Sequence, residues 1–257
     1  MPGVGACLVP CLPPERCRRG LSFRFLNLEH AFNERVDWDF SGHGRLWAYN
    51  LNYFHWLDAS DPMKELPLIK DYLARLGQLK VGLEPYPTSL RIMSFIRFLA
   101  QTKGLQVNIL KGINTSLAAQ AKMLSRNLEY HLLGNHLLEN GLALFMAGVH
   151  LEDQFLMDRA GDVLIPQLQE QVLADGAHFE LSPMYHRIIL GHVLDCINLC
   201  KGTPGELGAD LSELLGKSAT KMMAWQQNMT FSCGVMPLFN DSAHGIAPEP
   251  RDIESYA

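Results

Sequence analysis

The 257-residue sequence is 47% hydrophobic and 19% charged, with a formal net charge of −5. This composition supports a substantial core, in one large domain or two small ones. It provides no concentrated basic surface of the kind that nucleic-acid-binding proteins carry. No run of about 18 apolar residues is present, so we expect no membrane span. The six cysteines are too sparse for a disulfide scaffold in a chain of this size.

The first 22 residues differ in composition from the rest of the chain. They make a poor signal peptide, because the apolar part is short and broken by Pro10 and the positive charges follow it. We expect residues 1–22 to be a disordered or atypical segment and residues 23–257 to form a single domain. The lack of a clear signal peptide favours a cytoplasmic location.

From about residue 60 onward, apolar residues recur at helical spacing. Asp61 is a candidate N-cap before Pro62, and Gly104 is a candidate helix stop. Helices are expected at 61–80, 87–104, 108–133, 132–148, 152–173, 182–200 and 210–229, whereas 45–57 and 231–241 look extended or irregular. The predicted fold is all-α, an incomplete or complete (α/α) toroid of helix pairs.

Polar residues interrupt the very apolar helix predicted at 132–148, close to its start. Asn135 and Glu139 are four residues apart, as are His136 and Asn140, so they form two adjacent stripes on one side of the helix. Such groups often only satisfy the free backbone groups of a helix start. They can equally form a polar site, in which Glu139 either orients His136 or makes an ordinary salt bridge.

Two further polar clusters also lie at element ends. Ser182 is a candidate N-cap and Pro183 occupies the first helical position, which puts Tyr185 in the first turn. His186 either assists Tyr185 or packs inside. The third cluster is a loop that contains Asn240, Asp241, Ser242 and His244, and such a loop is often only a turn. In a helical toroid, loops at one end form the mouth of a cleft, so we expect the three clusters to share a location.

Aromatic residues are concentrated at 46–57, where Trp47 and Tyr53 alternate with polar residues such as Asn50. Sugars bind by stacking on aromatic rings together with dense hydrogen bonding, so this segment is a candidate cleft wall. The alternative is an ordinary aromatic core patch. Near the next predicted helix start, Tyr86 and Arg91 are further candidates for binding substrate. Arg91 either holds a carboxylate through two parallel hydrogen bonds or caps a surface helix.

Five strings in the same order resemble the heparinase II/III family of polysaccharide lyases: LWAYNLNYFHWL, EPYPTSLRI, LLGNHLLENGLAL, DGAHFELSPMYH and MPLFNDSAHGIAP. The resemblance runs from about Phe23 to the last residue. It implies an N-terminal α/α toroid followed by a C-terminal β-sandwich domain that supplies part of the catalytic apparatus. This chain resembles only the toroid, so that domain is expected as a missing partner. A periplasmic or cell-envelope location is also implied.

The resemblance further implies β-elimination on a uronic-acid polysaccharide that is heparan-sulfate-like, alginate-like or an exopolysaccharide. By this likeness Asn135 and His136 contact the substrate carboxylate, and Tyr185 is the catalytic tyrosine. The candidate residues for binding the anionic polysaccharide are Trp47, Asn50, Tyr53, Tyr86, Arg91, Glu139, His186 and Asn240. No cofactor or metal is implied by any spacing.

Two other functions remain open from the residues. An α/α-toroid glycoside hydrolase would need two carboxylic acids beside the scissile bond, for which Glu139, Glu180 and Asp241 are candidates. The chain could also bind glycans without cleaving them, as a fragment that lacks its second domain.

Overall fold

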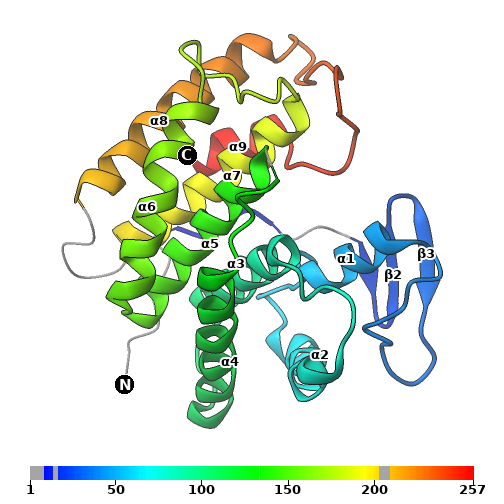
Figure 1. Cartoon of the computed structure of the whole chain (residues 1–257). Helices are drawn as coiled ribbons and strands as arrows, with labels where there is room; N and C mark the ends of the chain where they lie inside the picture. The colour runs from blue at the N-terminus through cyan, green and yellow to red at the C-terminus, as the bar shows by residue number, and fades with distance from the viewer. Residues whose placement is uncertain (1–8, 14–16, 133, 203–208) are drawn as a thin grey trace.

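Helices make up most of the protein (Figure 1). The computed structural model describes residues 9–13, 17–132, 134–202 and 209–257. The helices in this part of the chain are α1 (Arg45–Tyr53), α2 (Pro62–Arg75), a short 3₁₀ helix (Leu76–Gln78), α3 (Pro85–Gln101), α4 (Val107–Arg126), α5 (Asn135–Leu151), α6 (Gln154–Gln171), α7 (Pro183–Lys201), α8 (Ala209–Met229) and α9 (Pro250–Tyr256). None of them is long and apolar enough to cross a bilayer.

Alternate helices share a layer. α1, α3, α5 and α7 pack in that order, while α4 packs on α3 and α5, α6 on α5, and α8 on α7 and α6. The chain therefore passes back and forth between an inner and an outer layer, as helix pairs in an (α/α) toroid do. The prediction of an all-α toroid is confirmed.

The α5 helix runs through the middle of this arrangement. Only His136 and Leu151 of its 17 residues are not buried, as expected for a helix that is hydrophobic on all sides. Gly148 lets α6 approach closely, since a Cβ there would lie 2.9 Å from the backbone nitrogen of Met157. The polar residues near the start of α5 must therefore find partners in the protein or lie at its accessible end.

The prediction that 45–57 is extended or irregular is wrong for its first part. Residues Arg45–Tyr53 form α1, in which Trp47, Ala48 and Leu51 share the buried face. The helix ends at Phe54, whose φ of 63° is left-handed. Burial of a face with helical spacing outweighed the strand propensity of the aromatic residues. Residues 231–241, in contrast, lack regular secondary structure as predicted.

A small antiparallel sheet precedes α1 and was not predicted. It consists of β1 (Arg18–Arg19), β2 (Ser22–Phe25) and β3 (Leu28–Ala31), with β2 in the centre. Phe23 and Phe25 are buried and alternate with polar residues, which is the pattern of a half-buried strand. Part of this sheet falls within the segment 1–22 that was expected to be disordered or atypical.

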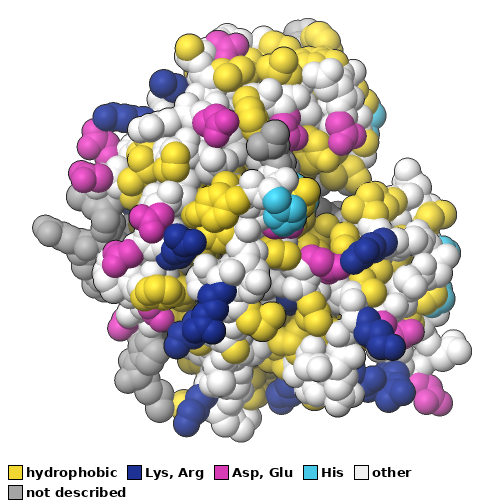
Figure 2. Space-filling model, viewed as in Figure 1, with side chains coloured by type: hydrophobic (Ala, Val, Ile, Leu, Met, Phe, Trp, Pro, Cys, Tyr) yellow, Lys and Arg dark blue, Asp and Glu magenta, His cyan; other side chains and the backbone are white. Residues whose placement is uncertain are grey.

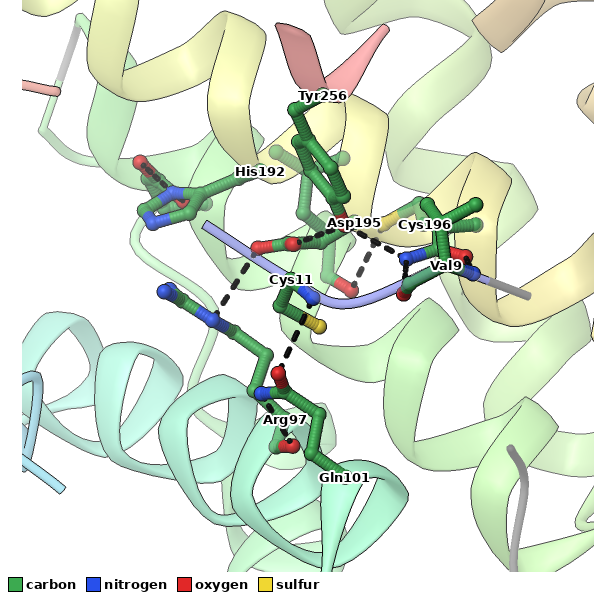
Figure 3. A network of polar contacts seen from close by, with 11 residues as sticks. Val9, Cys11, Arg97, Gln101, His192, Asp195, Cys196 and Tyr256 are labelled. Atoms are coloured by element: carbon green, nitrogen blue, oxygen red, sulfur yellow. Dashed lines mark hydrogen bonds and ion pairs between the residues drawn. The ribbon is translucent and has the colours of Figure 1, made fainter. Parts of the chain in front are cut away.

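Residues 9–13, here called the N-terminal strap, lie across α3, α7 and α9 (Figure 3). The side-chain amide of Asn198 binds both backbone groups of Val9: it accepts from the N–H at 2.9 Å and donates to the C=O at 2.8 Å. The same amide donates to the Tyr256 hydroxyl at 2.9 Å, and the backbone N–H of Cys11 donates to Gln101 at 3.2 Å. Two side-chain amides thus hold an extended segment by its backbone.

Candidate functional site

The starts of α3, α5 and α7 meet at one place in the structure. The rings of Tyr86, in the first turn of α3, and His136, in the first turn of α5, lie 4.3 Å apart. The backbone N–H of Asn135 donates to Glu180, just before α7. In the space-filling view a depression separates the surface formed by α7 and α8 from that formed by α1 and the strands, and a histidine and acidic side chains lie along it (Figure 2).

Glu180 holds the start of α5. Its Oε1 accepts the N–H of Asn135 at 2.6 Å, and so satisfies one of the free donors of that helix start. Gly134 precedes it with a φ of 89°, and a Cβ there would lie 2.6 Å from the same Oε1, so only glycine fits. The Asn135 side chain is 4% exposed, and it makes no hydrogen bond to any residue that the structure describes. Burial raises the pKa of Glu180, and the bond from Asn135 opposes that rise.

His136 is the exposed member of the α5 cluster. Its side chain is 38% exposed, and its Nδ1 lies 3.4 Å from Oε1 of Glu129. The suggestion that Glu139 orients His136 is wrong, because Glu139 is fully buried and binds Nδ1 of His192 at 2.8 and 2.9 Å. Glu139 is therefore sealed from substrate. Sequence analysis missed Glu129, which precedes the helix and carries no spacing signal.

Tyr185 lies where its capping signals predicted. Ser182 accepts the N–H of Tyr185 at 3.2 Å and donates to the backbone carbonyl of Asp241 at 2.7 Å, so it joins the start of α7 to the loop. The Tyr185 hydroxyl donates to Asp241 Oδ2 at 3.0 Å. Asn240 anchors the same loop by donating to the carbonyl of Leu181 at 2.7 Å. Burial, together with the Asp241 and Glu180 carboxylates, raises the pKa of Tyr185 to about 12.

His186 does not face Tyr185, and the prediction that it assists there is wrong. The ring is fully buried. Its Nδ1 accepts the N–H of His178 at 3.2 Å, and its Nε2 lies 3.0 Å from the carbonyl of Met222. Burial lowers the pKa of His186 to about 4. A neutral imidazole with hydrogen on Nε2 satisfies both bonds, so His186 is a structural residue.

Arg91 is also structural, and its predicted carboxylate contact is wrong. The side chain is 1% exposed. Its guanidinium donates to Gln120 at 2.7 Å, to the carbonyls of Gly82 and Asn52 at 2.8 and 3.3 Å, and to Thr88 at 3.1 Å. It therefore ties α3 to α4 and to the loop before α3, and no substrate can reach it.

The aromatic residues of 46–57 divide between core and site. Trp47 is fully buried against Phe25 and Phe40, so its predicted stacking on a sugar is wrong and the core alternative holds. The Asn50 amide donates within α1 to the carbonyl of Leu46 at 2.8 Å. Tyr53, in contrast, packs edge-on to Tyr86 with ring centroids 6.1 Å apart, directly behind the site. Burial raises the pKa values of both tyrosines.

Comparisons with known proteins place this arrangement among characterised folds. Residues 87–251 match the family described as Heparinase II/III N-terminus. A heparin-sulfate lyase of Bacteroides thetaiotaomicron is 30% identical over 122 residues, which cover 44% of this chain and 17% of that protein. The chain therefore spans less than a fifth of the length of that curated relative.

Two solved structures share the fold. A heparan sulfate lyase, HepC, from Pedobacter heparinus has a TM-score of 0.56 at 20% identity, covering 87% of this chain and 39% of that chain. A crystal structure of heparinase III has a TM-score of 0.58 at 19% identity, covering 82% of this chain and 36% of that chain. At this level of identity the likeness concerns the fold.

Proposed function

This chain belongs to the heparinase II/III family, and we propose that it is the toroid domain of a polysaccharide lyase that cleaves uronic-acid polysaccharides by β-elimination. The observation that carries the proposal is that the starts of α3, α5 and α7 lie together: the ring of Tyr86 packs on that of His136, and the Glu180 carboxylate, which accepts the N–H of Asn135, also acts on Tyr185. The substrate is proposed to be heparan-sulfate-like, with alginate-like polymers and exopolysaccharides as the other candidates. Polymers of this kind are met outside the cytoplasm, which favours the periplasm or cell envelope.

The role of Asn135 and His136 follows from the difficulty of the reaction. The proton at C5 of a uronate is weakly acidic, because its removal adds a second charge to a group that already carries one. The Asn135 amide and a protonated His136 would donate hydrogen bonds to the carboxylate where that charge develops. The amide of Asn135 is available as a donor, since it makes no hydrogen bond within the described part of the protein.

Tyr185 is proposed as the proton donor to the departing glycosidic oxygen. A phenolate base would need a nearby cation to lower its pKa. The groups around Tyr185 are instead the Asp241 and Glu180 carboxylates, which raise the pKa of Tyr185 and keep the hydroxyl protonated. The group that removes the C5 proton is proposed to lie in the C-terminal β-sandwich domain that the resemblance implies.

The same carboxylates favour a second candidate, a glycoside hydrolase. Glu180 and Asp241 both lie beside Tyr185, and burial raises the pKa of Glu180, as a general acid requires. With Glu139 sealed by His192, these two remain the possible catalytic pair of a hydrolase. A hydrolase would release reducing ends without forming an unsaturated uronate.

The test is an assay of uronate oligosaccharides for binding and for the ultraviolet absorbance of the unsaturated product. With the β-sandwich domain supplied, we expect Tyr185→Phe to lower the rate of β-elimination by about 10²–10⁴-fold without weakening binding. The matched control Tyr49→Phe, which removes a hydroxyl bound to Glu84, should leave the rate unchanged.

Three outcomes would contradict the proposal. New reducing ends without absorbance, lost in Glu180→Gln, would establish the hydrolase. Binding without cleavage, even when the β-sandwich domain is supplied, would establish a glycan-binding protein. No binding of any uronate oligosaccharide would reject the site altogether.

A further inference from the structure

Glu129 is held beside His136 by two hydrogen bonds with the side chain of Asn140, one accepted and one donated by the amide. The Asn140 side chain accepts the backbone N–H of Glu129 at 3.0 Å through Oδ1, and donates to Glu129 Oε2 at 3.1 Å through Nδ2. Its second amide hydrogen goes to Ser89, whose hydroxyl in turn donates to the carbonyl of Pro85. Asn140 is fully buried and Glu129 is 4% exposed. Every hydrogen-bonding group of the Asn140 amide is thus used, and the orientation of its oxygen and nitrogen is fixed.

The other oxygen of Glu129 faces His136. Oε1 lies 3.4 Å from Nδ1 of the imidazole, and Nδ1 is buried without a hydrogen-bond partner among the described residues. Because 38% of the side chain is exposed, the exposed edge of the ring is the one away from Nδ1. The Tyr86 ring packs on the imidazole at 4.3 Å with an interplanar angle of 32°, and so restricts its rotation.

We propose that Glu129 is a positioning residue that keeps a hydrogen on Nδ1 of His136 and thereby presents Nε2 to the depression. A carboxylate only accepts hydrogen bonds, so the nitrogen that faces it is stabilised when it carries hydrogen. Neutral histidine in water favours hydrogen on Nε2 instead. Glu129 therefore selects the less common tautomer, in the way that carboxylates orient histidine ligands and bases.

This arrangement makes Nε2 the nitrogen that gains or loses a proton at the site. In the neutral ring Nε2 is an acceptor, and after protonation it is a donor directed at bound substrate. The role of this arrangement in catalysis, which is to direct a hydrogen-bond donor at the uronate carboxylate, rests on the proposed function. The assignment of the tautomer does not depend on the proposed function.

The substitution Glu129→Gln tests the tautomer with little change of shape. Asn140 Nδ2 donates to the position of Oε2, so the oxygen of the new amide must lie there and its NH₂ group must face His136. An NH₂ group donates, so Nδ1 must then accept and hydrogen must move to Nε2. The hydrogen bonds from Asn140 thus predict that the tautomer of His136 is inverted in Glu129→Gln, and not only that the two tautomers become mixed.

The measurement is ¹⁵N NMR of the histidine rings of the substrate-free protein at about pH 8.5, about two units above the pKa of histidine in model peptides. His136 is assigned by the signal that disappears in His136→Asn. We expect hydrogen on Nδ1 in the wild type and on Nε2 in Glu129→Gln. The matched control Glu180→Gln, which alters the contact to the backbone of Asn135, should leave the His136 tautomer unchanged.

Two results would overturn the proposal: hydrogen on Nε2 in the wild type, or hydrogen that stays on Nδ1 in Glu129→Gln while circular dichroism shows a folded protein. If Glu129→Gln does not fold, the wild-type spectrum alone decides. Because no substrate is used, an inverted tautomer in a protein that shows no lyase activity even with the β-sandwich domain supplied would reject the proposed function and leave the role of Glu129 intact.

Discussion

Replacing His186 with asparagine should flatten the pH dependence of stability on the acid side. In the folded protein burial lowers the pKa of His186 to about 4, whereas the unfolded chain titrates near the ordinary 6.5. Since the depressed pKa belongs to the folded state, the stabilisation is complete above about pH 6.5 and is lost as the pH falls through about 4. The full difference is about 3 kcal/mol, of which about 2.5 kcal/mol is lost by pH ~4.5.

Asparagine keeps part of the local structure without titrating. Its Oδ1 can accept the N–H of His178, as Nδ1 does now, while the carbonyl of Met222 loses its donor at a cost of about 1–3 kcal/mol at neutral pH. The assay is urea unfolding at pH 7 and pH 4.5, compared within each protein. We expect the loss of stability on acidification to be about 2.5 kcal/mol smaller in His186→Asn than in the wild type. The exposed His131→Asn serves as a control with wild-type behaviour.

An identical acid-induced loss in His186→Asn and wild type would refute the reasoning. It would mean that His186 is accessible to protons in the folded state.

Three further substitutions test contacts that hold the fold together. Arg91→Met should lower the free energy of unfolding by about 3 kcal/mol or more, because it leaves buried acceptors unpaired; urea unfolding checks this, and the exposed Arg45→Met should change it little. Asn198→Leu should release the N-terminal strap and speed alkylation of buried Cys11, followed by peptide mass spectrometry; an unchanged rate would show that the amide does not hold the strap. Gly134→Ala should destabilise the protein by about 1–2 kcal/mol through its left-handed backbone, measured by thermal unfolding, and a stability equal to wild type would contradict the tight fit against the carboxylate.

The parts of the fold and site that depend on nearby residues were predictable. Ser182 is an N-cap residue and Pro183 follows it at the first helical position, and both signals can be read from the local sequence. The place of Tyr185 in the first turn therefore followed from its immediate neighbours. The helices α2 to α8 followed from the spacing of apolar residues, whereas the short helix α9 was not predicted. His136 is exposed at the start of a buried helix, as its position in the pattern indicated, whereas Asn135 beside it is buried.

The parts that depend on distant partners were not predictable. Arg91 has the chemistry to bind a carboxylate, and only the fold shows that Gln120, Gly82 and Thr88 occupy its donors. Glu139 lies one turn from His136 on the same helix, but its carboxylate points to His192, 53 residues along the chain. The spacing of residues in the sequence shows which of them share a face of a helix. It does not show which residues of other elements pack against that face.

The sheet and α1 show a different limit. Phe23 and Phe25 alternate with polar residues over only four positions, too short a run to stand out against a helical chain. In α1 the residues that recur at helical spacing are interrupted by tyrosines and asparagines, which obscured the period. The ring of Phe25 in β2 packs edge-on against that of Trp47 in α1, so packing between the two elements outweighs intrinsic propensity.

Between two inner helices an outer helix carries the chain back. The inner helices α3, α5 and α7 therefore all begin at the same end of the molecule (Figure 1). Each helix start carries a partial positive charge of about half a unit from its backbone, and none of the three has an acidic residue in its first turn. These partial charges are met by carboxylates at the same end of the molecule: Glu84 is the N-cap of α3, Glu180 accepts from the start of α5, and Asp241 binds Tyr185 in the first turn of α7. An anionic polymer that binds at this end as proposed must approach these carboxylates, so higher ionic strength should favour its binding by screening the repulsion.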